Sequence, residues 1–243
     1  MKSTKDLLLL LLVLAGAAGA GFWVLQMDAG SILPQQQTQA DQATTAAGGA
    51  SDLAYRPNRE GVQSPEKKKE HIRNKFESIV NGFLTDLEEK TLAYREKRTV
   101  VRDMVKPSNM RQFEYVSENN TFARNLMAEM ETDMDQIIER YEKTDQQIKT
   151  LFKMLEDDAA AAELNAEWSK TKSEQLEKYM VFFGYERQIF DEYRVILNCF
   201  MQSNGKYSVD LDKGSVRFDD PALNNVYMDA SARVKALNDR ETQ

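Results

Sequence analysis

Few residues in this chain of 243 residues have the types and spacing that catalysis requires. The chain has one histidine, His71, and one cysteine, Cys199. A zinc site needs several such ligands, and an activated nucleophile needs a neighbouring base, so both kinds of site are nearly excluded. His71 follows the charged run Glu66–Glu70 and Cys199 lies in an apolar run. We therefore expect a solvated histidine and a buried, unreactive thiol.

Acidic residues could supply acid–base or metal chemistry, but their spacing does not favour it. The segment Asp210–Gly214 resembles a calcium loop only weakly, because no glutamate closes a twelve-residue loop, and a turn is the better interpretation. A di-iron bundle needs Glu-x-x-His pairs, and His71 belongs to none. Nothing implies a cleft around the acidic pairs Glu88-Glu89, Asp157-Asp158 and Asp219-Asp220. The sequence thus predicts no catalytic residue, no bound metal and no cofactor.

The composition favours helices and argues against a nucleic-acid partner. The formal net charge is −7, whereas a protein that binds phosphate backbones needs a basic face. Charged residues make up 29% and hydrophobic residues 42% of the chain, with only five prolines and eleven glycines. This mixture is typical of amphipathic helices and makes an all-β fold a poor candidate.

The segment Leu7–Leu25 is uncharged and mostly apolar. About 19 residues of helix span roughly 28 Å, which is close to the thickness of the hydrocarbon core of a bilayer. Lys2 and Lys5 precede the segment and Asp28 follows it, so the N-terminus is expected in the cytoplasm. We interpret residues 1–27 as a signal-anchor that makes a single-pass membrane protein. The expected setting is a bacterial inner membrane, with the rest of the chain in the periplasm.

A cleaved signal peptide is the alternative for the same segment. The triplets Ala15-Gly16-Ala17 and Ala18-Gly19-Ala20 could each serve as a cleavage site. Both interpretations export the rest of the chain. Residues 28–64 are rich in Gln, Ala, Thr, Gly and Ser and contain few large apolar residues, so they are expected to form a disordered linker.

Residues 65–204 are expected to form a long antiparallel three-helix coiled-coil bundle, with helices at about 65–105, 109–157 and 159–203. Pro107 separates the first two helices. The apolar positions of the first helix are Ile72, Phe76, Ile79, Phe83, Leu87, Tyr94, Val101 and Met104.

The second helix carries a seam of residues in alternating steps of three and four, which predicts coiled-coil packing. Two polar residues, Asn120 and Thr144, interrupt this seam, and such residues commonly fix register or partner choice. They are our candidate partner-specifying positions. The seam consists of Phe113, Val116, Asn120, Ala123, Met127, Met130, Met134, Ile137, Tyr141, Thr144, Ile148, Leu151 and Leu155.

The second half of the third helix is apolar around much of its circumference and needs a further neighbour. Residues 205–243 supply candidates: an alternating hairpin over 206–218, whose turn contains Gly214, and a helix that starts near Pro221. We expect Tyr207, Val209 and Leu211 to share the packed face of the hairpin. The hairpin and last helix should cap the end of the bundle near Pro107. Aromatic residues of the third helix could instead line a ligand pocket: Tyr179, Phe182, Phe183, Tyr185 and Phe190.

These features favour a non-enzymatic envelope protein. A membrane anchor holds a mainly α-helical domain that would act as a scaffold or adaptor in a membrane-associated assembly, with protein partners that are copies of itself or other chains. One alternative is an extracytoplasmic bundle that binds or senses a ligand. The other is a cleaved component of a secretion system or pilus.

Overall fold

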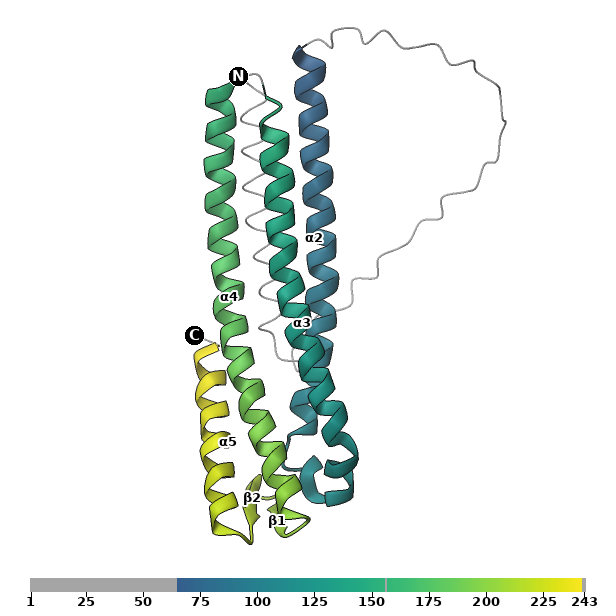
Figure 1. Ribbon diagram of the computed structural model, residues 1–243, viewed down its shortest axis with the longest axis vertical. Helices are drawn as coiled ribbons and strands as arrows, with labels where there is room; N and C mark the ends of the chain where they lie inside the picture. Colours follow the sequence, from purple (N-terminus) through teal and green to yellow (C-terminus); the bar gives the residue numbers. More distant parts are fainter. Residues whose placement is uncertain (1–64, 156, 242–243) are drawn as a thin grey trace, which may run out of the picture.

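The computed structural model describes residues 65–155 and 157–241, and these residues are mainly helical. The elements in chain order are α2 (Pro65–Met104), the short 3₁₀ helix η1 (Asn109–Arg111), α3 (Phe113–Phe152), α4 (Asp158–Ser203), β1 (Tyr207–Asp210), β2 (Ser215–Phe218) and α5 (Pro221–Glu241) (Figure 1). The predicted membrane segment and linker lie outside the described residues. Within those residues, no helix is long and apolar enough to cross a membrane.

The three long helices run side by side, up, down and up, as the sequence predicts (Figure 1). The antiparallel register of α2 and α3 is set by polar contacts along their shared edge. Lys97 Nζ lies 2.8 Å from Asp133 Oδ2, and Arg140 Nη2 lies 2.6 Å from Asp86 Oδ2. The two residue numbers add up to 230 in the first pair and to 226 in the second. Each residue of α2 therefore has a defined turn of α3 opposite it.

The predicted seam of α3 forms its buried face. Phe113, Asn120 and Leu155 are only partly buried. Phe113 is the first residue of α3, and Leu155 lies beyond its end. Every other seam position is buried: Val116, Ala123, Met127, Met130, Met134, Ile137, Tyr141, Thr144, Ile148 and Leu151.

Two boundaries of the second helix differ from the prediction. Helix α3 begins at Phe113 rather than near Asn109, because η1 occupies residues 109–111 and buries Met110 against the bundle. It ends at Phe152 rather than near residue 157. The reason is that Asp157 has extended backbone angles and caps α4, accepting hydrogen bonds from the backbone N–H groups of Ala159 and Ala160.

The hairpin packs its apolar side on the end of α4. Tyr207 pairs with Phe218, and Val209 pairs with Val216. The ring of Phe200 on α4 contacts the rings of Tyr207 and Phe218, with centroids 4.8 and 5.1 Å away. Leu211, which we expected on this face, is instead 49% exposed because it lies in the turn after β1 has ended.

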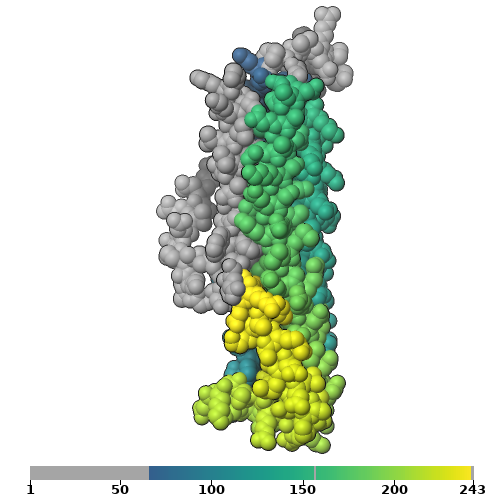
Figure 2. All heavy atoms as spheres, turned by 90° about the vertical axis from the view of Figure 1, so that its left-hand side faces the viewer, coloured from purple at the N-terminus to yellow at the C-terminus, as the bar shows by residue number. Residues whose placement is uncertain are grey.

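Helix α5 covers more of the bundle than a cap would. After the hairpin the chain reverses, and α5 runs back along α4 (Figure 2). Arg233 donates two hydrogen bonds to the Glu192 carboxylate, at 2.6 and 2.8 Å, and Arg102 Nη2 donates to Asn238 Oδ1 at 3.1 Å. The half of the rod near the hairpin therefore has four packed helices. The other half contains α2, α3 and the first part of α4 among the described helices.

Candidate functional site

The two predicted partner-specifying residues, Asn120 and Thr144, lie on the same helix and are not brought together. The Asn120 Oδ1 atom accepts a hydrogen bond from Arg124 Nε at 3.1 Å, and Arg124 Nη2 donates to Asn198 Oδ1 at 2.6 Å. This chain of contacts joins α3 to α4. Asn120 thus takes part in a contact between two helices of the same chain.

Thr144 is buried inside the bundle, with 1% of its surface exposed. Among the described residues its hydroxyl has no hydrogen-bond partner. Its neighbour Asp145, which the sequence interpretation missed, makes the polar contacts at this level: it accepts from Trp168 Nε1 at 3.0 Å and pairs with Lys149 and Lys172. Burial raises the pKa of Asp145, but hydrogen bonds from these three side chains outweigh it and keep the pKa below its usual range.

The aromatic residues proposed as a pocket fill the core instead of lining a cavity. Tyr179, Phe182, Phe183 and Phe190 are each no more than 2% exposed, and Tyr185 is partly buried. Phe183 contacts both Phe182 and Tyr179, with ring centroids 5.6 and 5.7 Å apart. Tyr94 of α2 packs against the same rings. These four rings of α4 therefore belong to the hydrophobic core.

A buried ion cluster joins three helices beside these rings. Arg98 of α2 lies between two carboxylates: its Nη2 atom is 2.8 Å from Glu186 Oε1 on α4 and 2.5 Å from Glu241 Oε2 on α5. The Tyr94 hydroxyl donates to Glu186 Oε2 at 2.7 Å. The Arg98 guanidinium also lies over the ring of Phe182, 5.4 Å from its centroid.

Burial and charge act in opposite directions within this ion cluster. The pKa of Glu241 is raised to about 7, because burial and then the Glu186 carboxylate raise it by more than Arg98 and Arg102 lower it. Burial alone would lower the pKa of Arg98, but the two carboxylates outweigh it and the pKa is raised. Arg98 therefore stays charged, and Glu241 is the member of the cluster that titrates near neutral pH.

The sequence carried a signal for this cluster that we did not use. Arg98 lies four residues after Tyr94 and three before Val101, so it continues the apolar spacing of α2. Glu186 lies between Phe183 and Ile189 on the apolar half of α4. A charged residue at a core position of each of two neighbouring helices is the pattern that predicts a buried pair.

The other residues with chemical potential have structural roles. Cys199 is buried, and burial raises the pKa of its thiol, so it is a poor nucleophile. His71 is exposed. Asp210 accepts from the backbone N–H of Lys213, and Asp220 accepts from that of Ala222, so both carboxylates cap local turns. Within residues 65–155 and 157–241, no group of histidine, cysteine and carboxylate side chains could hold a metal ion.

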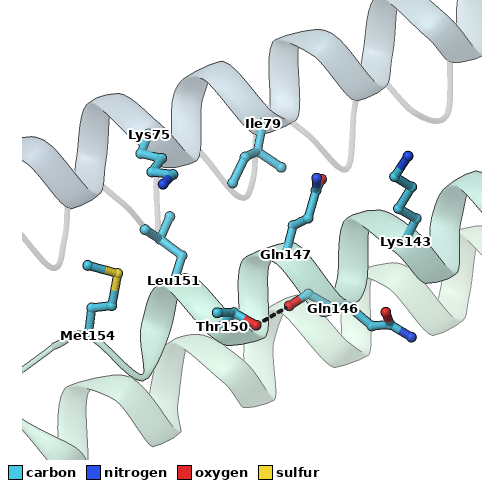
Figure 3. Close-up of a pocket in the computed structure, with 8 residues that line it drawn as sticks. All are labelled: Lys75, Ile79, Lys143, Gln146, Gln147, Thr150, Leu151 and Met154. Atoms are coloured by element: carbon cyan, nitrogen blue, oxygen red, sulfur yellow. Dashed lines mark hydrogen bonds between the residues drawn. The ribbon is translucent and has the colours of Figure 1, made fainter.

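A surface groove of about 430 Å³ lies between α2 and α3 (Figure 3). Its walls combine aliphatic side chains with two lysines, Lys75 and Lys143, which have no ion-pair partner in the described part of the chain. Ile79, which we expected in the core, is partly buried and forms part of this wall, while Val80 takes the core position. The groove is further lined by Gln146, Gln147, Thr150, Leu151 and Met154.

This groove lies where the polar contacts between α2 and α3 stop. From Asp86 to Lys97, side chains of α2 reach across to α3 and close the edge between the helices. Around Lys75 and Ile79 none of the described side chains bridges the two helices in this way. The groove offers apolar contact beside positive charge.

Comparisons of this chain with protein-family models, with curated proteins and with solved structures found no match.

Proposed function

We propose that this protein is a membrane-anchored, non-enzymatic scaffold or adaptor whose rod-shaped helical domain holds partner proteins at a distance from a bilayer. In this proposal Leu7–Leu25 is the transmembrane helix, with its N-terminus in the cytoplasm. Residues 28–64 are a flexible linker, and residues 65–204 are a coiled-coil bundle in the periplasm. Partners bind along the rod or at its end.

The observation that carries the proposal is the way the interior of the rod is filled. The buried aromatic rings contact one another. The buried carboxylates of Glu186 and Glu241 each form an ion pair with Arg98 of another helix. A catalytic site would need an open cavity with reactive groups facing it. In the described residues the reactive side chains instead hold helices together, which is what a spacer or scaffold requires.

The length of the rod supports the same function. Helix α2 contains 40 residues, and at 1.5 Å per residue it is about 60 Å long. The first residue of α2, Pro65, lies at one end of the rod, and the hairpin and η1 lie at the other (Figure 1). The proposed linker, residues 28–64, has an r.m.s. reach of about 35 Å. The far end of the rod could therefore find partners tens of ångströms from the membrane.

A photocrosslinking experiment on membranes tests this function. A photoreactive amino acid replaces Leu211 in the hairpin turn, Val226 on α5, or Ala162 at the other end of α4, all of which are exposed. We expect discrete adducts with a membrane-associated protein at Leu211 or Val226 and none at Ala162. Absence of adducts at all three positions, in membranes that contain the intact chain, would argue against a scaffold.

Two alternatives make different predictions. A ligand-binding bundle would use the aromatic residues near Tyr179, but their rings are packed together, so the scaffold is the better proposal. A cleaved secretion or pilus component would have the same rod without the anchor. The mass of the mature protein distinguishes that alternative from the anchored form.

A further inference from the structure

One exposed side of α2 carries a regular charge pattern. Residues seven apart lie on nearly one line along a helix. One such line on α2 has two positive residues, a glycine and two negative residues in order: Lys68, Lys75, Gly82, Glu89 and Glu96. Lys68 is partly buried and the other four are exposed. We call these five residues the α2 stripe.

The charges of the α2 stripe are complementary to those of a second α2 stripe that runs in the opposite direction. If a second α2 lies antiparallel over the first with Gly82 on Gly82, Lys75 faces the partner's Glu89 and Lys68 faces the partner's Glu96. The reciprocal pairs follow by symmetry, so four pairs of opposite charge form. Parallel pairing in register would place like charges opposite one another. The pattern therefore selects one orientation.

Gly82 lies at the centre of the stripe and is exposed on the part of the surface that the structure describes. A Cβ atom at this position would meet nothing within 4 Å, and the residue is helical. Glycine is a poor helix former, so an exposed glycine in the middle of a 40-residue helix needs an explanation. Close approach of another helix backbone is a physical reason for it.

The open groove lies beside the positive half of the same stripe. Lys75 belongs to both the groove and the stripe, and Ile79, one turn further along α2, also lines the groove (Figure 3). In the described residues neither Lys75 nor Glu89 has an ion-pair partner. An antiparallel second α2 would cover Ile79 and the neighbouring Leu151 and Met154. Its negative half, with the partner's Glu89, would bring the opposite charge to this basic end.

We propose that the protein forms a twofold antiparallel dimer through the α2 stripe and the adjoining α2–α3 groove, with Gly82 at the twofold axis. The occupant of the groove is a second copy of this chain. The paired segment from Lys68 to Glu96 is about 42 Å long at 1.5 Å per residue. A narrow contact of this polarity belongs with weak interfaces, so we expect a dissociation constant on the order of 10 µM.

The dimer does not depend on the proposed scaffold function, and it is compatible with two anchors in one membrane. Antiparallel rods place the two α2 N-termini at opposite ends. Residues 28–64 can span roughly 120 Å when extended, which exceeds the length of the rod. Both copies could thus remain anchored while the rods lie side by side.

Cysteine crosslinking of the full-length chain tests the position of the axis. Gly82→Cys places two thiols next to each other in this dimer, and an added copper–phenanthroline oxidant would join them as a disulfide. Glu88→Cys is the matched control, because Glu88 is also exposed but lies about 120° around α2 from Gly82. The native Cys199 is buried, so the unmodified chain reports the background. We expect a crosslinked dimer with Gly82→Cys only, and equal crosslinking at both positions would overturn the proposal.

Charge reversal tests the pairing independently of crosslinking. In sedimentation of the full chain in density-matched detergent, Lys75→Glu or Glu89→Lys should each weaken the dimer about tenfold, because each loses two ion pairs and gains two repulsions. The double variant restores both pairs and should return to within about threefold of the original dissociation constant. Glu88→Lys is the matched control and should change nothing. A chain that stays monomeric at 100-fold the expected dissociation constant, or a dimer that none of these changes affects, would overturn the proposal.

Discussion

Glu241 is the residue whose ionisation has the largest expected effect near neutral pH. It lies next to Glu186 and Arg98, is buried, and titrates at about 7 rather than at its ordinary 4.5. Between these two values the folded protein binds more protons than the unfolded chain. The stability that this group contributes is therefore fully present below pH 4.5 and is lost as the pH rises through 7.

We predict that the free energy of unfolding falls by up to about 3 kcal/mol between pH 5 and pH 8 because of Glu241. Hydrogen exchange of the α5 backbone, measured across this range, reports the change at the helix that Glu241 holds. Glu241→Gln removes the titrating group, so its pH dependence should be flatter. An unchanged profile in Glu241→Gln would assign the effect to other groups.

Thr144 provides a second test at the level of single residues. Its buried hydroxyl has no hydrogen-bond partner among the described residues, so removing it relieves a desolvation penalty. Thr144→Val should leave stability unchanged or raise it by about 1 kcal/mol in chemical denaturation. Thr91→Val is the matched control, because the equally buried Thr91 hydroxyl donates to the Glu88 carbonyl at 3.0 Å, and it should be less stable. A Thr144→Val chain that changes its oligomeric state would support the original view of Thr144 as a register residue.

At the scale of elements, the hairpin determines where α5 begins. Phe218 of β2 touches the rings of Phe200, Tyr207 and Tyr227, which belong to α4, β1 and α5. The Phe218→Ala variant should be less stable by about 3 to 5 kcal/mol, because removing a large buried ring leaves a cavity. Leu211→Ala, at an exposed position in the same hairpin, should change stability by less than about 0.5 kcal/mol. Equal effects in thermal unfolding would mean that the hairpin does not anchor α5.

The elements themselves were largely predictable, because spacing reports burial directly. The three-and-four spacing from Val116 to Leu151 identified the buried face of α3, and Pro221 marked the start of α5. The sequence did not show that α3 ends at Phe152, because Asp157 caps α4 instead of continuing α3. Capping depends on backbone angles, which the dipeptide Asp157-Asp158 does not reveal. Leu211 was misplaced for a related reason: strand alternation does not show the residue at which pairing stops.

The polar contacts between elements were harder to predict. Arg98, Glu186 and Glu241 come from three helices, and only their packing brings the three side chains together. Asn120 looked like a partner-specifying residue because it interrupts the apolar seam. The seam does not reveal its contact with Arg124, which in turn reaches Asn198 on α4. No sequence motif marks the groove around Lys75. The groove forms where none of the described side chains bridges α2 and α3.

For the whole molecule, we propose that a membrane segment and a linker hold this rod at a bilayer. Without the anchor the same fold would be a freely diffusing component, and a scaffold fixed at the membrane would not be the right description. The first 27 residues therefore decide between the two accounts.

The most direct test extracts membranes from the producing cells with alkaline carbonate and measures the intact mass of the protein. We predict that the protein stays in the membrane pellet with the mass of the complete chain, 27.8 kDa. A soluble protein whose mass places its N-terminus near Ala18 or Gly21 would contradict the anchored scaffold.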